Sequence, residues 1–394
     1  MPKMPRRPGG RPVPNMYHIA LKMLLGDRGK YLMLISGLTF ATLLMTQQAS
    51  VFCGLMLWTT GNLRNMRAQI WVVDPKVEQA NEVKSLRDTD VSRVRSVTGV
   101  AWAVPLYWAV QQAKLPDGTF KSVQLVGLDS ATLVGRPGQI TAGKLEDLRL
   151  PNTVFIDDLA VQRLSFGRPK PVGIGDSFEI NDKEARIVGI CKTEKSFFGY
   201  PYIFATYDQA LQFAPKTRKM LSFILAEPAP GWTAERAAAQ IQKDTQLRAF
   251  TEDQFFWSTI RWYFRNTGIP MSFGTTVLLG FIVGTAVAGQ TFYTFVLENL
   301  RHLGALKAMG ASDGLLARML LLQALIVGLL GYGIGVGLSA LFGFLVLEKG
   351  QPPFIMPYQI PVGTLVVVLL ICGFAALLGI RKVRQLEPAI VFRG

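Results

Sequence analysis

The chain has 394 residues, a formal net charge of +15 and three cysteines. Cys53 and Cys372 lie in apolar runs, which leaves Cys191 without an intrachain partner and excludes a disulfide scaffold. The positive charge requires no nucleic-acid partner, because most of it lies in short segments beside apolar runs. There Lys and Arg are attracted to the anionic headgroups of membrane lipid.

Four uncharged apolar runs predict an integral membrane protein, with one transmembrane helix before a large polar region and three after it. The runs are Tyr31–Trp58, Phe273–Leu297, Met319–Leu347 and Val362–Ile380. A helix rises about 1.5 Å per residue, so about 20 apolar residues cross a hydrocarbon core of about 30 Å. We expect the first run to be an uncleaved anchor, because it is about twice as long as the apolar part of a signal peptide.

The distribution of Lys and Arg predicts how the helices are oriented. Residues 1–30 carry seven basic side chains against one acidic one, and residues 381–394 carry four against one. The positive-inside rule therefore places both termini in the cytoplasm of a bacterial inner-membrane protein. The connection 298–318 lies on the same side, and residues 59–272 lie outside.

These observations predict nine segments along the chain. They are a basic cytoplasmic tail (1–30), a first transmembrane helix (31–58), an extracytoplasmic domain (59–272), a second transmembrane helix (273–297), a cytoplasmic coupling segment (298–314), a third transmembrane helix (315–347), an outer hairpin (348–360), a fourth transmembrane helix (361–380) and a cytoplasmic tail (381–394).

The extracytoplasmic domain shows a mixed α/β pattern. Strands are predicted at 69–73, 104–115 and 119–126, the last two as a hairpin, and a second hairpin at 175–190 turns at Asn181 and Asp182. A strand followed by a helix is expected at 153–164, and helices at 88–97 and 234–248. Thr251 and Gln254 have capping-box spacing and open an aromatic helix that suits the headgroup region.

Signals of catalysis are weak. Both histidines, His18 and His302, fall in segments assigned to the cytoplasm, so neither can act outside. Asp157 and Asp158 are better explained by a helix N-cap than by paired acid chemistry. Residues 138–144 resemble a phosphate loop, but Leu145 stands where a Ser or Thr must reach magnesium. We therefore predict no catalytic, cofactor or metal site.

The segment between the second and third membrane runs carries the most information. Leu300, Leu303, Leu306 and Met309 recur every three residues, and Gly310 is placed to end the helix. A short amphipathic helix at the cytoplasmic surface can dock on another protein or rest on lipid, and periodicity leaves both open.

Small residues in the membrane runs indicate close helix packing. Gly280 and Gly284 with Ala288 one turn later lie on one face, and Gly331 with Gly335 and Gly333 with Gly337 repeat the spacing. Spacing leaves open whether each pair packs within one subunit or between two.

The stretch 303–312, together with 321–325 and 329–335, resembles the FtsX/MacB-type ABC transporter permeases and most closely their DevC branch. The ending Arg381-Lys382-Val383-Arg384, with Glu387-Pro388-Ala389, is similar too, and so is 179–190 of the outer domain. The one-plus-three layout is also that of the family.

The resemblance implies a homodimeric permease that works with two copies of a separate ABC ATPase, which binds the ATP and Mg²⁺. It further implies mechanotransmission, in which the ATPase moves the outer domain for efflux or envelope export, with an HlyD-like adaptor and a TolC-like outer-membrane channel. An alternative is an FtsX-like regulator of an envelope enzyme that exports nothing. The residues expected to couple to the ATPase are Glu298, Arg301, Leu303, Leu306, Lys307 and Met309. The Gly280/Gly284 face of the second run and part of the first run are expected to form the twofold contact.

Overall fold

The structure is a computed structural model that describes residues 23, 28–166, 170–215, 221–349 and 352–384. Most of the predicted tail 1–30, and the tail beyond Arg384 with Glu387-Pro388-Ala389, lie outside these residues. The chain divides into two compact units. One comprises Met1–Gly54 and Ile269–Gly394, and the other Leu55–Gly268.

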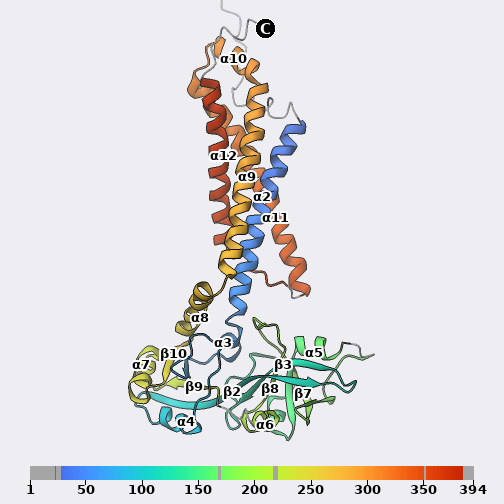
Figure 1. Cartoon of the computed structure of the whole chain (residues 1–394), viewed down its shortest axis with the longest axis vertical. Helices are drawn as coiled ribbons and strands as arrows, with labels where there is room; N and C mark the ends of the chain where they lie inside the picture. Colours follow the sequence, from blue (N-terminus) through green and yellow to red (C-terminus); the bar gives the residue numbers. More distant parts are fainter. Residues whose placement is uncertain (1–22, 24–27, 167–169, 216–220, 350–351, 385–394) are drawn as a thin grey trace, which may run out of the picture. The chain divides into compact units, whose positions relative to one another are not determined.

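The first unit is helical and contains the four predicted apolar runs (Figure 1). Its helices are α2 (Arg28–Trp58), α9 (Ile269–Glu298), the short α10 (Leu300–Ala308), α11 (Asp313–Lys349) and α12 (Gln359–Arg384). Helix α12 packs against both α9 and α11, and α2 contacts α9 and α11 on the same core. The one-plus-three layout predicted from hydropathy is therefore confirmed. Each helix after the outer domain extends beyond its apolar run, because flanking polar residues continue the same hydrogen-bond ladder.

The predicted outer hairpin returns onto the helices of its own unit. The backbone N–H of Ile355 donates to the carbonyl oxygen of Ser50 at 3.1 Å. Phe354 is buried, and its ring centroid lies 5.9 Å from that of Phe342 on α11. The described part of the connection between α11 and α12 is therefore held in place by the contact of Phe354 with Phe342.

The second unit is a mixed α/β domain built on one sheet (Figure 1). Its strands follow the order β10-β1-β9-β2-β3-β8-β5-β7-β4, and β6 pairs with β2 and β7. Their bounds are β1 (Ile70–Val73), β2 (Val100–Lys114), β3 (Phe120–Leu128), β4 (Gln139–Gly143), β5 (Thr153–Asp157), β6 (Ser177–Ile180), β7 (Lys183–Lys192), β8 (Tyr202–Thr206), β9 (Phe223–Pro228) and β10 (Arg248–Thr251).

Strand β2 belongs to both halves of this sheet. Its first part pairs with β9 up to Leu106, and its second part pairs with β3 from Tyr107 onward. Near its end, Ala113 and Lys114 pair with β6, which closes β2, β3, β8, β5, β7 and β6 into a ring. One 15-residue strand thus joins an open half and a ring-shaped half.

Helices cover both halves and complete three cores. They are α3 (Gly61–Met66), α4 (Asp88–Arg95), α5 (Asp158–Leu164), α6 (Tyr207–Phe213), α7 (Ala234–Thr245) and α8 (Glu252–Asn266), with a 3₁₀ turn η1 (Leu145–Arg149). Helices α4 and α7 pack on one face of the open half, α3 and α8 contribute to the core on its other face, and α5 and α6 pack in the ring. The mixed α/β prediction is confirmed.

Local differences from the sequence predictions have physical causes. Helix α7 ends at Thr245 rather than 248, because Gln246 adopts a left-handed conformation and Arg248 enters β10. The capping box of Thr251 and Gln254 is present as predicted. Phe255 does not contribute to an aromatic belt, because it is fully buried against Trp71 and Phe250 in the domain core.

Candidate functional site

Between α9 and α11 the chain forms the short helix α10 and one tight turn. The C-terminus of α10 and the N-terminus of α11 are both capped at this turn. Two hydrogen bonds end α10 in a Schellman motif: Gly310 N–H to the Lys307 carbonyl and Ala311 N–H to the Leu306 carbonyl, each 3.0 Å. Gly310 has φ +98°, which a side chain at Cβ would strain. Ser312 then caps α11 through its hydroxyl, which accepts from Leu315 N–H.

An ion pair closes the same turn. Lys307 Nζ lies 2.8 Å from an Asp313 carboxylate oxygen, so the last turn of α10 is tied to the first turn of α11. A cation near a helix C-terminus and an anion near a helix N-terminus each interact favourably with the helix dipole. The sequence predicted Lys307 as a coupling residue, and the structure places it in this brace.

The apolar side chains of α10 do not all face outward as a docking surface. Leu303 is 2% exposed and Leu306 9%, and both pack in the core that α2, α9, α11 and α12 share. Met309 is 76% exposed, because the helix ends before it. Leu303 and Leu306, which we expected to couple to the ATPase, are therefore already covered by helices of their own chain.

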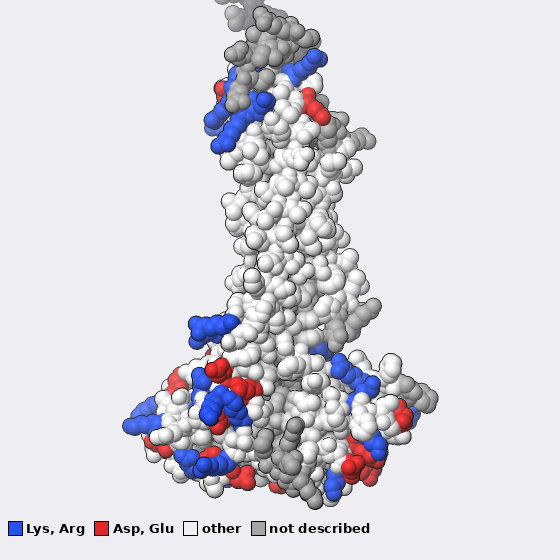
Figure 2. Space-filling model, viewed as in Figure 1, with Lys and Arg blue, Asp and Glu red and all other residues white. Residues whose placement is uncertain are grey.

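The exposed face of this connection combines small residues with a few charges of both signs. Arg301, His302, Ala305 and Met309 are exposed, and Glu298 lies at the end of α9 beside it. Figure 2 shows Lys and Arg side chains at the α10 end of the helical unit, whereas the middle of its helices carries none on the visible face. A partner that binds here would contact Arg301, His302 and the Met309 thioether among small residues, and would not contact Leu303 or Leu306.

The predicted packing glycines contact helices of the same chain. A Cβ built on Gly284 would lie 2.6 Å from Ala41 Cβ of α2, and one on Gly280 would lie 3.3 Å from Met45 Cγ. Ala288, one turn after Gly284, is also buried. This face of α9 is therefore occupied within one subunit, which disagrees with the expectation that it forms the twofold contact.

The same holds for one face of α11. A Cβ on Gly331 would lie 2.8 Å from Leu38 Cβ, and one on Gly335 would lie 2.6 Å from Thr42 Cβ, both on α2. Nothing lies within 4 Å of the corresponding positions on Gly333 and Gly337 among the described residues. Small-residue spacing thus marks two faces of α11, and α2 uses one of them.

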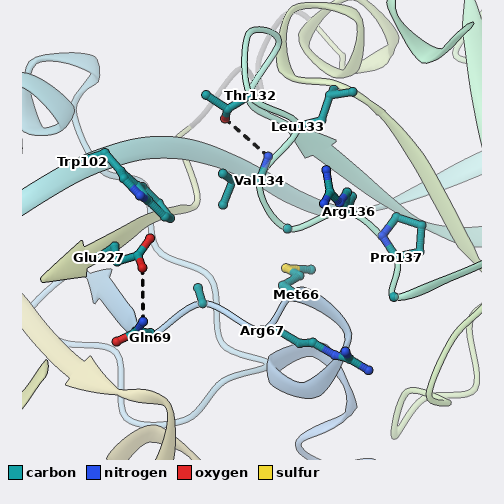
Figure 3. A pocket seen from close by; sticks show the side chains of 13 residues that line it. Met66, Arg67, Gln69, Trp102, Thr132, Leu133, Val134, Arg136, Pro137 and Glu227 are labelled. Carbon is teal, nitrogen blue, oxygen red and sulfur yellow. Dashed lines mark hydrogen bonds between the residues drawn. The ribbon is translucent and has the colours of Figure 1, made fainter. Parts of the chain in front are cut away.

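The extracytoplasmic domain contains two neighbouring hollows that sequence reasoning missed. One, of about 470 Å³, is lined by residues from 66–69, 132–138, Trp102 and Glu227 (Figure 3). In it Gln69 Nε2 donates to Glu227 Oε1 at 3.3 Å. The other, of about 580 Å³, shares Arg67 and Gly138 with it. Their residues come from segments far apart in sequence, so no local motif could have identified them.

The second hollow contains charges of both signs. Arg64 lies 3.2 Å from the Glu194 carboxylate, and Arg67, Lys192 and Glu252 also line the space. Burial and then the neighbouring Asp253 raise the pKa of Glu252. Among the described residues no three His, Cys, Asp or Glu side chains are grouped as metal ligands would be. The arrangement has the character of a solvated surface cleft.

Asp157 is an N-cap, as predicted. Its carboxylate accepts from Ala160 N–H at 2.7 Å and from the Thr193 hydroxyl at 2.9 Å. Burial raises its pKa to about 6, although these hydrogen bonds oppose the shift. Asp158 follows as the first residue of α5, so the pair does not form an acid–base couple. Burial also raises the pKa of the nearby Cys191 thiol, which keeps it protonated and unreactive.

The phosphate-loop resemblance at 138–144 does not survive in three dimensions. Residues Gln139–Gly143 form strand β4, paired with β7, and only a 3₁₀ turn follows. A phosphate loop instead needs a strand, a loop and the N-terminus of a full helix.

Comparisons with known proteins match both units. The model of the MacB-like periplasmic core domain matches residues 32–244, more than half of the chain, and that of the FtsX-like permease C-terminal region matches 274–388. An ABC transporter permease of Mycobacterium bovis is 27% identical over 315 residues, which cover 77% of this chain and 78% of the relative. One of Mycobacterium tuberculosis is 25% identical over 320 residues, covering 78% and 79%.

Two further matches cover part of the chain. The macrolide export ATP-binding/permease protein MacB 1 of Yersinia pestis is 26% identical over 204 residues, 50% of this chain but 31% of that longer protein. The crystal structure of the periplasmic region of MacB from Actinobacillus actinomycetemcomitans covers 52% of this chain and 95% of its own, with 14% identity and a TM-score of 0.37. That structural similarity is weak, and the assignment rests on the sequence matches.

These matches do not single out the DevC branch, which stays a prediction. The FtsX/MacB type does not depend on it, because separate family models match the outer domain and the C-terminal membrane region. With four apolar helices arranged one plus three around a mixed α/β domain, this chain belongs to the FtsX/MacB-type ABC transporter permeases, multi-pass proteins of the cell membrane.

Proposed function

We propose that the chain is the membrane subunit of an ABC exporter in which a separate ATPase moves the extracytoplasmic domain. The observation that carries the proposal is the structure of α10: Leu303 and Leu306 are packed into the helical core, and Arg301 and His302 are exposed on the other face. A displacement applied to the exposed face must move the helices that hold Leu303 and Leu306, because close-packed cores transmit strain.

Short, braced connections support transmission into the outer domain. Only Thr267 and Gly268 separate α8 from α9, and only Thr59 and Thr60 separate α2 from α3. Helix α8 is fastened to its own domain, where the Thr259 hydroxyl accepts from Ala80 N–H at 3.0 Å. In this proposal, a movement of α9 is passed to α8 through the two-residue connection.

The helices favour motion over passage of a polar substrate. The four apolar runs contain no Asp, Glu, Lys or Arg, so they offer no charged path across the membrane. This supports mechanotransmission for efflux or envelope export, with both termini in the cytoplasm. The assembly would comprise a homodimer, two ATPase subunits that bind ATP and Mg²⁺, an HlyD-like adaptor and a TolC-like channel.

Co-purification followed by reconstitution tests the proposal. The tagged chain is isolated from native membranes, the ATPase that accompanies it is identified by mass spectrometry, and ATP hydrolysis is measured in proteoliposomes. We expect Arg301→Glu to abolish most of the stimulated hydrolysis, because it reverses a charge on the exposed face of α10. Arg261→Glu, the same reversal on exposed α8, serves as the matched control.

Two results would contradict the proposal. One is the absence of any ABC ATPase among the co-purified proteins. The other is equal hydrolysis in the Arg301 and Arg261 variants at equal complex recovery. An adaptor among the partners supports export, whereas an envelope hydrolase in its place supports the regulatory alternative.

A further inference from the structure

A third cavity, of about 260 Å³, lies in the extracytoplasmic domain where β2 changes partner. Pairing passes from β9 to β3 between Leu106 and Tyr107. Ser222, just before β9, secures this junction. Its hydroxyl accepts from Trp108 N–H at 2.9 Å and donates to the Trp108 carbonyl at 3.1 Å. The wall of the cavity is therefore fixed by backbone hydrogen bonding.

The lining is uncharged and combines apolar side chains with the polar Asn81, Gln124, Ser196 and Ser222. Trp108 and Val110 are two residues apart and so lie on the same face of β2. Val83 and Phe198 line the cavity from loops. Phe198 is 59% exposed and Val110 39%, so apolar surface stays open to solvent here. Among the described residues, none of those lining the cavity carries a charge. Such a lining disfavours ions and favours an uncharged occupant.

One polar group in the lining lacks a partner. Gln124 lies opposite Val110 in the β2–β3 ladder and is 5% exposed. Its amide nitrogen, Nε2, is buried and has no hydrogen-bond partner among the described residues. A buried donor without an acceptor is costly, so a ligand oxygen that reached this group would gain a hydrogen bond.

We propose that this cavity binds a small neutral amphiphile. Its aromatic or aliphatic body would lie against Trp108, Val110 and Phe198, and a carbonyl or hydroxyl oxygen would accept a hydrogen bond from Gln124 Nε2. The volume is slightly below the range of about 300–1,000 Å³ that is usual for drug-sized ligands, which limits the occupant to a compact molecule. The inference is independent of the coupling proposed above, because the cavity lies wholly within one domain.

Binding is tested with the neutral naphthyl ketone Prodan, whose fluorescence shifts to the blue in apolar surroundings. The full chain in lipid nanodiscs is titrated, and the signal of empty nanodiscs is subtracted. We expect saturable binding at one site per chain. Gln124→Leu should weaken it about twofold to tenfold, the range of one neutral hydrogen bond. It should leave unchanged the binding of the parent dimethylaminonaphthalene, which lacks the ketone.

Filling the cavity gives a second, independent test. Val110→Trp places a large ring in the space and should reduce binding at least about tenfold, a loss that corresponds to one well-buried apolar contact. Ile140→Trp is the matched control, because Ile140 is a strand residue of similar exposure, 37%, outside the cavity. Thermal unfolding of each variant establishes that it is folded.

Three outcomes would overturn the proposal. They are a titration that does not saturate above empty nanodiscs, equal binding by the Val110 and Ile140 variants, and an equal loss of both probes in Gln124→Leu. The last outcome would show that the amide makes no hydrogen bond to the ketone.

Discussion

Replacing Gly335 with alanine tests the packing of α11 against α2. The new Cβ would lie 2.6 Å from Thr42 Cβ and 2.8 Å from the Thr39 carbonyl oxygen, well inside ordinary van der Waals distance. Backbone is one of the two obstacles, so a rotamer change cannot relieve the clash. The helices must separate, and overpacking of this kind costs about 1–3 kcal/mol.

Gly333→Ala is the control, because nothing lies within 4 Å of its Cβ position among the described residues. Both substitutions remove a helical glycine, which favours the helix by about 1 kcal/mol in each case. The difference between the two variants therefore isolates the packing term. We expect the Gly335 variant to be less stable than the Gly333 variant by about 1–3 kcal/mol. Equilibrium unfolding in mixed micelles, followed by tryptophan fluorescence, measures it.

Equal stability of the two variants would refute the reasoning, since it would mean that α2 does not approach Gly335 so closely. A larger loss in Gly333→Ala would also refute it. That result would place the tighter contact on the face that α2 leaves open.

Two further predictions concern caps. The pKa of Asp157 is raised from an ordinary 3.8 to about 6, so its contribution to stability is complete below about pH 4 and is lost as the pH rises through 6, about 3 kcal/mol in all. Asp157→Asn keeps the capping oxygen, and unfolding at pH 4 and pH 8 should show a smaller loss than in the parent; an unchanged pH dependence would contradict the assignment. Gly310→Ala should cost about 1–2 kcal/mol at φ +98°, whereas Gly314→Ala, in open space on α11, should not, and equal unfolding midpoints would show that the Schellman turn does not need glycine.

Sequence reasoning predicted well the features that depend on local chemistry. The four apolar runs form four helices, because a helix is the local structure that pairs all backbone N–H and C=O groups within lipid. Asn181 and Asp182 both adopt positive φ in the turn between β6 and β7, as their ability to enter the left-handed region allows. The capping box of Thr251 is also a local feature, because its partner Gln254 lies only three residues away.

Features that depend on distant partners were missed. Strand β8 pairs in parallel with β3, and β5 in parallel with β7. Parallel strands are not joined by a tight turn, so no local turn motif in the sequence indicates these pairings. The hollows at Arg67 and the cavity beside Gln124 likewise gather residues from separate segments. Periodicity identifies an apolar face but not what covers it, so it could not show that helices of the same chain cover Leu303 and Leu306.

The glycines of α11 show the same limit in its simplest form. Gly333 and Gly335 are two residues apart, which is a rotation of about 200° on a helix. The pair Gly331/Gly335 and the pair Gly333/Gly337 therefore lie on opposite faces. Both pairs have identical spacing, and only the tertiary structure shows that Gly331 and Gly335 meet α2. Among the described residues, the Gly333/Gly337 face, not the Gly280/Gly284 face, is therefore where small residues leave room for another helix.

The buried position of Leu306 also changes how a coupling mutant must be interpreted. Leu306→Glu would place a carboxylate in the core formed by α9, α11 and α12, and an unpaired buried charge costs several kcal/mol. Loss of activity in that variant would follow from damage to the helical unit even if no ATPase bound there. Arg301 and Met309 can be altered without this effect, because both are exposed. Coupling in this chain is therefore tested on the exposed face of α10, where a change in partner binding and a change in folding can be measured separately.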